Sequence, residues 1–124
     1  MIEAYFAHIE QVLQSVPNTQ SLSIRKTLYN NKQGYLAGSI LFEGGDRLDF
    51  AEVKNTDHAG KVKYRYQYMD AAQTMIFRYD NAPHHRHVVT FPHHKHDGDV
   101  IRDSLELSLA DVLLEIAEYQ RSFS

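Results

Sequence analysis

Hydrophobic residues recur with helical spacing at the two ends of the chain. An apolar stripe with a period of three to four runs from Ile2 to Val16, and Pro17 ends it. Near the C-terminus, Ser108 followed by Asp111 resembles a capping box with Asp in place of Glu, and a second apolar stripe follows it. The pattern predicts one amphipathic helix at each end.

Between these helices, polar and apolar residues alternate, which is typical of strands with one buried face. The predicted strands span residues 20–29, 34–42, 47–54, 61–69 and 74–80, and residues 84–106 show no pattern that assigns them. The 124 residues are therefore predicted to form one α+β domain, residues 1–124. We expect an antiparallel sheet of about five strands with the N-terminal and C-terminal helices packed on one face.

The short loop at residues 44–46 sets an expected register for the second and third strands. A three-residue loop there would match charges and apolar side chains across a hairpin. The expected pairs are Glu43–Arg47, Phe42–Leu48 and Ile40–Phe50.

The most regular alternation lies in the fourth and fifth predicted strands, where three tyrosines share one face. A four-residue loop at 70–73 gives the expected pairs Tyr68–Met75, Tyr66–Phe77 and Tyr64–Tyr79 on one face, and Arg65–Arg78 and Lys63–Asp80 on the other. The tyrosines would stack on nucleic-acid bases or pack in the core, and their apolar partners favour the core. Two facing arginines repel unless an anion lies between them, so the other face is a candidate phosphate site.

Composition narrows the function classes. Hydrophobic residues make up 43% of the chain, which indicates a folded protein, and the absence of Cys excludes disulfides, thiolate metal ligands and cysteine nucleophiles. No apolar run approaches the roughly 18 residues that a membrane span needs, and the N-terminus lacks the basic flank of a secretion signal. We expect a cytoplasmic protein with no membrane association.

Positive charge and histidine are concentrated in one stretch. The chain has a net charge of −3, yet residues 61–96 hold six basic and two acidic residues, a net charge of +4. Six of the eight histidines lie between 84 and 96, and their protonation would add positive charge in mildly acidic solution. This stretch is expected to present a face for an anionic ligand.

A repeated histidine motif carries the candidate chemistry. Residues 83–87 read Pro-His-His-Arg-His, and residues 92–96 read Pro-His-His-Lys-His. In extended chain His85 and His87 would share one face, as would His94 and His96. The candidate catalytic residues are His84, His85, His93, His94 and His96, and the candidate phosphate-binding residues are Arg65, Arg78 and Lys95.

Three interpretations of the motif are open at this point. In the first, imidazoles act as general base and general acid in cleavage of RNA without metal, while the cations bind the phosphate. In the second, imidazoles bind a metal ion, but the adjacent Arg86 and Lys95 disfavour a dication, so no metal and no cofactor are expected. In the third, the imidazoles only bond backbone carbonyls. Separately, Glu52 and Lys54 are expected to be solvated charges, with catalysis by Glu52 as the alternative.

Three segments resemble the TumE family of small prokaryotic proteins: GYLAGSILFEGGDRLDFAE, KYRYQYMDAAQTMIFRYDNAPHH and TFPHHKH. The resemblance runs from residue 20 to residue 120 and is most specific between Tyr64 and His96. It implies the toxin of a type II toxin–antitoxin pair, located in the cytoplasm and neutralised by a partner encoded beside it. Residues 86–89 look like a variable insert, which makes His87 the weakest of the six histidine candidates.

The leading hypothesis is a toxin that binds RNA or another phosphate-bearing ligand through a basic, histidine-rich face without metal. Whether it also cleaves the RNA is left open by the sequence. A rival from another class is a non-enzymatic interaction protein whose basic face docks an acidic antitoxin or another protein. A further rival is a metal-binding protein with histidine ligands. The sequence leaves open whether the chain forms a homo-oligomer, and it does not identify the substrate.

Overall fold

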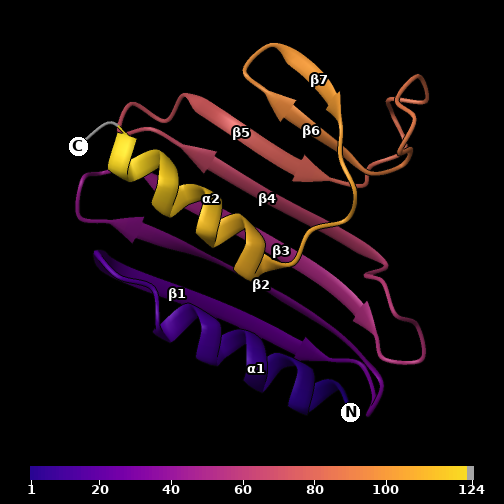
Figure 1. Ribbon diagram of the computed structural model, residues 1–124. Helices are drawn as coiled ribbons and strands as arrows, with labels where there is room; N and C mark the ends of the chain where they lie inside the picture. Colours follow the sequence, from indigo (N-terminus) through magenta and orange to yellow (C-terminus); the bar gives the residue numbers. More distant parts are fainter. Residues whose placement is uncertain (123–124) are drawn as a thin grey trace.

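The computed structural model describes residues 1–122, which form an α+β fold around one antiparallel sheet (Figure 1). The elements in chain order are α1 (Ile2–Gln14), β1 (Thr19–Leu28), β2 (Gln33–Phe42), β3 (Arg47–Asn55), β4 (Lys63–Met69), β5 (Met75–Asp80), β6 (His94–Asp97), β7 (Val100–Asp103) and α2 (Leu109–Ser122). The strands pair in chain order from β1 to β7. The predicted α+β class is confirmed, but the expectation of about five strands is wrong, because β6 and β7 arise from the segment that the pattern left unassigned.

Both predicted helices form, and each buries its apolar stripe. In α1 the buried side chains are Ile2, Phe6, Ile9 and Leu13, and in α2 they are Leu109, Val112 and Ile116. The capping box is confirmed: the Ser108 N–H donates to the Asp111 carboxylate and the Asp111 N–H donates to the Ser108 hydroxyl, each at 3.1 Å. The reciprocal bonds satisfy two backbone donors at the start of α2.

Both helices lie in front of the same face of the sheet (Figure 1). Their buried residues share one core cluster with the inward side chains of β2 to β5. Tyr64, Tyr66 and Tyr68 belong to this core and are each at most 2% exposed, so the core interpretation of the tyrosines is confirmed. The opposite face, which we call the outer face, is covered by neither helix.

The small residue at position 38 allows β1 and β2 to pack closely. A Cβ atom on Gly38 would lie 1.9 Å from the Ser23 carbonyl oxygen and 2.8 Å from the Phe50 ring. A larger residue there would push the two strands apart, so glycine is required by space at this position.

The predicted hairpin registers are wrong by two residues, although the faces are right. Across β2 and β3, Ile40 pairs with Leu48 and Leu41 with Arg47, because the loop closes with a bond from the Phe42 N–H to the Asp46 carbonyl. The bond leaves residues 43–45 in the loop, so the loop has the predicted three residues but begins one residue earlier than predicted.

The β4–β5 hairpin shows the same kind of shift. A bond from the Asp70 N–H to the Thr74 carbonyl closes the loop around residues 71–73, so Met69 pairs with Met75 and not with Thr74. An irregularity after Tyr68 shifts the pairing by one more residue. The observed pairs are Arg65–Asp80, Tyr66–Tyr79, Gln67–Arg78 and Tyr68–Phe77. The predicted facing pair of arginines therefore does not exist.

Neither helix of the described residues combines the length and the apolar character that a membrane crossing requires.

Candidate functional site

Polar side chains from three strands form two rows on the outer face. The pairings place Arg65 of β4 opposite Asp80 of β5, and Asp80 opposite His94 of β6. In the next row, Arg78 lies opposite His96. Because alternate residues of a strand point to the same side, all of these side chains lie on the face that the helices leave uncovered.

Asp80 is the centre of this arrangement. One carboxylate oxygen accepts a hydrogen bond from Arg78 Nε at 2.9 Å, and the other lies 2.9 Å from His94 Nε2 and accepts from the Ala82 N–H at 3.0 Å. The Asp80 side chain is only 7% exposed. Removal of a carboxylate from water is costly, and these three donors compensate for the lost hydration.

The hydrogen-bond partners assign the protons of His94 and His96. His94 Nδ1 lies 2.9 Å from the Pro92 carbonyl, which only accepts, so Nδ1 carries a proton. Arg78 Nη2 lies 2.9 Å from His96 Nε2, and since a guanidinium only donates, this imidazole nitrogen is an acceptor. The two Nε2 atoms are 3.2 Å apart, so His94 Nε2 is placed to donate to His96 as well as to Asp80.

The neutral form of His96 is favoured by its surroundings. Loss of hydration, followed by the charge of Arg78, lowers the pKa of His96 below its ordinary value, while Asp80 opposes the shift. The same residue therefore accepts a hydrogen bond and resists protonation, which agrees with the assignment from its partners.

His85 comes from the loop between β5 and β6 and completes the group. Its ring centroid lies 4.8 Å from that of His94 and 5.2 Å from that of His96, both edge-on. Loss of hydration lowers the pKa of His85, and the neighbouring His94 and His87 lower it further. We call His85, His94 and His96 the histidine cluster. His87, which the sequence ranked last, also lies close to it, with its ring centroid 5.8 Å from that of His85.

The structure does not bring the other predicted residues into the cluster. His93 stacks on Tyr64, and its Nδ1 lies 2.8 Å from the tyrosine hydroxyl on the helix-covered side. Lys95 lies on that side too, where its Nζ is 2.9 Å from the Glu115 carboxylate of α2. Strand alternation explains the separation, because residues 93 and 95 face opposite to 94 and 96. His84 is exposed at the edge of the loop.

Two arginines that the sequence did not single out, Arg25 and Arg47, also lie on the outer face, and the strand pairings place Arg25 in the same row as Arg65. Arg25, Arg47 and Arg65 line a hollow of about 200 Å³, and Ala37 and Ala51 also belong to its lining. Arg47 is paired with Asp49 at 2.7 Å. Among residues 1–122, neither Arg25 nor Arg65 takes part in an ion pair. The alternation of residues between two faces in β1 and β3 places Arg25 and Arg47 on the outer face. Their closeness to Arg65 follows only from the register of the strands, which the sequence pattern does not provide.

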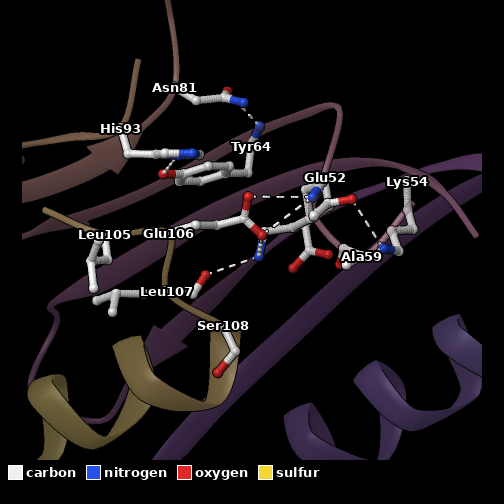
Figure 2. A network of polar contacts seen from close by, with 12 residues as sticks. Glu52, Lys54, Ala59, Tyr64, Asn81, His93, Leu105, Glu106, Leu107 and Ser108 are labelled. Atoms are coloured by element: carbon white, nitrogen blue, oxygen red, sulfur yellow. Dashed lines mark hydrogen bonds and ion pairs between the residues drawn. The ribbon is translucent and has the colours of Figure 1, made fainter. Parts of the chain in front are cut away.

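The expectation that Glu52 and Lys54 are solvated is wrong. Both are buried on the helix-covered side, in the network shown in Figure 2. Glu52 accepts a hydrogen bond from the Tyr66 hydroxyl at 2.6 Å and another from the Tyr5 hydroxyl. Lys54 Nζ donates to the carbonyls of residues 58, 59 and 60 at 2.6 to 3.0 Å. Burial, followed by the charge of Glu52, raises the pKa of Tyr66 well above its ordinary value.

Lys61 connects this network to the segment before α2. Its Nζ lies 3.1 Å from the Glu106 carboxylate and 2.9 Å from the Leu107 carbonyl, and its side chain is 7% exposed. The ammonium also sits over the ring of Tyr64 at 5.1 Å. Because Glu52, Lys54 and Lys61 are buried and each has its own polar partners, this network supports the fold, whereas the outer face remains open to a ligand.

Comparison with known proteins links the chain to a family of toxins. The family model described as Toxin TumE matches residues 9–120. The matched span contains all seven strands, the histidine cluster and the arginines of the outer face. Searches of curated proteins and of solved structures found no match.

Proposed function

The chain belongs to the TumE family of toxins, and from this premise we propose that it is the toxin of a type II toxin–antitoxin pair and acts on RNA in the cytoplasm. The observation that carries the RNA assignment is the position of unpaired arginines in one row with the histidine cluster, on a face that no helix covers. The protein has a net charge of −3, so the attraction for RNA is local to this face.

The row provides a path for an extended RNA strand. Strand pairings place Arg25, Ala37, Ala51, Arg65, Asp80 and His94 side by side from β1 to β6. Five strand spacings correspond to roughly 24 Å. Cations at Arg25 and Arg65 would hold phosphates at two points, and the small alanines between them would let the backbone approach the sheet.

Cleavage without metal requires a neutral imidazole that reaches the 2′-hydroxyl. His85 is the proposed base, because it lies in the loop with part of its ring accessible and its lowered pKa favours the neutral imidazole. His94 is 1% exposed and acts through its neighbours as a positioning residue. The exposed His87 beside His85 is the proposed second proton carrier, and Arg65 is the proposed partner of the phosphate charge.

The antitoxin is proposed to be encoded beside the toxin. Since the outer face carries two unpaired arginines, an antitoxin that covers it would present acidic side chains there. Such binding would neutralise the toxin by excluding RNA from the same surface.

The proposal is tested with purified, untagged protein and labelled single-stranded RNA. Wild-type protein should bind and cleave the RNA, His85→Ala should bind without cleavage, and Arg65→Ala should bind more weakly. His58→Ala is the matched control, because this exposed histidine lies outside the outer-face rows and should leave both activities unchanged.

Expression in cells, with and without the neighbouring reading frame, should show toxicity that the neighbour suppresses. If His85→Ala stays fully toxic and the wild type does not bind RNA, the RNA assignment is wrong and the face is a protein-docking surface.

A further inference from the structure

We propose that the histidine cluster and Asp80 form a binding site for one divalent transition-metal ion of the Zn²⁺ type. This inference concerns metal binding by the free protein and goes beyond the proposed action on RNA. The sequence led us to expect no metal ion. The positions of the side chains in the structure favour one instead.

The separations of the donor atoms match the coordination shell of a small cation. His94 Nε2 lies 3.2 Å from His96 Nε2 and 2.9 Å from an oxygen of Asp80. His96 Nε2 lies 3.6 Å from the other oxygen of Asp80. With metal–ligand distances near 2.0 to 2.1 Å, neighbouring ligands of a tetrahedral zinc ion are about 3.3 Å apart. The ligand atoms of all three histidines lie within 4.8 Å of one another, so His85 is placed as a fourth ligand.

The site has the outer support that metal-binding histidines need. The bond from His94 Nδ1 to the Pro92 carbonyl turns Nε2 toward Asp80 and His96, as in metal sites where the second ring nitrogen bonds a carbonyl. His94 and Asp80 are 1% and 7% exposed, so the surrounding strands hold them in place. The lone pairs of two imidazole Nε2 atoms at this distance repel each other unless a proton or a cation lies between them. A metal ion would bind both nitrogen atoms.

The residues that disfavoured a dication in the sequence do not face the cluster. Lys95 is held by Glu115 on the helix-covered side, and Arg86 lies over the Phe91 ring at 5.5 Å. The cation that does face the cluster is Arg78, which bonds both Asp80 and His96. Arg78 therefore occupies the same acceptors that a metal ion would use, and the two compete.

The donor set also selects the class of metal. Three imidazoles and one carboxylate suit Zn²⁺, Ni²⁺, Cu²⁺ or Fe²⁺, whereas Mg²⁺ and Ca²⁺ prefer shells made of oxygen atoms. We therefore expect Zn²⁺ to bind in the presence of excess Mg²⁺.

The test uses the full chain without an affinity tag, titrated by calorimetry with Zn²⁺ alone in buffer that contains Mg²⁺. The expected result is one equivalent per chain and a higher melting temperature with Zn²⁺ than without it. Co²⁺ should give the visible absorption of a four-coordinate site. His96→Ala and His85→Ala should weaken binding, for His96→Ala by more than about 100-fold, since even outer-shell partners are worth about 10- to 100-fold.

Two further variants make the test specific. His58→Ala should bind Zn²⁺ like the wild type, and Arg78→Met should bind it more tightly, because the competing cation is gone. Circular dichroism checks that each variant is folded. The proposal is overturned if the folded wild type does not bind Zn²⁺, or if His58→Ala loses as much affinity as His96→Ala. These readouts contain no RNA, so a failure of the RNA proposal leaves them unaffected, and the reverse also holds.

Discussion

Asp80 and His94 lie directly opposite each other on β5 and β6, with a carboxylate oxygen 2.9 Å from the imidazole Nε2 and both side chains almost completely buried. A buried pair of this kind adds little net stability over an apolar pair, but loss of one partner leaves an uncompensated charge. The pair therefore links the candidate site to the stability of the fold, because it holds β6, which carries His94 and His96 of the cluster, against β5.

The first prediction is that Asp80→Asn destabilises the protein by about 3 kcal/mol, because it removes the buried carboxylate that balances the Arg78 guanidinium and faces the His94 imidazole. Urea unfolding followed by circular dichroism measures the loss. Asp49→Asn is the matched control, since its partner Arg47 is on the same face but 46% exposed, and a loss below about 1 kcal/mol is expected there. Equal losses in the two variants would show that the Asp80–His94 pair has no special role.

The second prediction concerns the unpaired arginines of the outer face. Arg25→Ala and Arg65→Ala should each weaken RNA binding and lower the salt dependence of the binding constant by about one counter-ion. The free energy of unfolding should change by less than about 0.5 kcal/mol, because neither side chain has a charged partner to lose. Fluorescence anisotropy at several salt concentrations measures the binding.

Lys26→Ala is the control for these arginines. Lys26 neighbours Arg25 in β1 but pairs with Glu10 of α1 at 3.0 Å, so it lies on the helix-covered side. Its removal should leave RNA affinity and salt dependence as in the wild type. A loss equal to that of Arg25→Ala would indicate general attraction to positive charge and not a path on the outer face.

The third prediction is that His85→Ala lowers the rate of RNA cleavage by a factor of about 10² to 10⁴, the usual contribution of a proton carrier. RNA affinity and the melting temperature should stay near the wild-type values, because the half-buried ring is not part of the core cluster. His93→Ala should show the reverse: it should lose stability with the bond to Tyr64 and keep the cleavage rate per folded molecule. Single-turnover cleavage assays separate the two variants.

The sequence predicted the helices, the capping box and the face of each residue in β4 and β5, because periods of 3.6 and 2 report directly on burial. It could not predict the register. A shift of two residues returns every side chain to the same face, so the hydrophobic pattern is equally satisfied by Tyr66 opposite Phe77 and by Tyr66 opposite Tyr79. The difference lies in the residues at which each loop closes and in the irregularity after Tyr68, which the pattern does not encode.

The candidate site could be predicted only in part for a related reason. The strands β6 and β7 have four residues each, and β6 reads His-Lys-His-Asp, without apolar alternation. The Gly98–Asp99 dipeptide between Asp97 and Val100, where Gly98 has a φ of 61°, was the available signal for a hairpin. The approach of His85 to His94 depends on the path of an irregular loop, which no periodicity describes.

The fourth prediction tests whether the Glu52 network serves the fold alone. Tyr66→Phe removes a donor from a carboxylate that is 1% exposed, so a loss of about 1.5 to 3 kcal/mol in the free energy of unfolding is expected. Tyr79→Phe is the control, since its acceptor Glu115 is 33% exposed and water can replace the lost hydroxyl. Toxicity per folded molecule should not change in either variant. A Tyr66→Phe protein that is stable but not toxic would move Glu52 into the functional site.

The fifth prediction joins the two proposals at the histidine cluster. A lone pair that binds a metal ion cannot accept a proton, so Zn²⁺ bound by His85 and its neighbours should inhibit RNA cleavage, and EDTA should restore it. Arg78→Met should be inhibited at lower Zn²⁺ concentrations than the wild type, because Arg78 competes with the ion for Asp80 and His96. RNA cleavage at increasing Zn²⁺, with Mg²⁺ in excess, measures both effects. Activation by Zn²⁺ would instead show that the ion takes part in the reaction, and proton abstraction by His85 would then be the wrong mechanism.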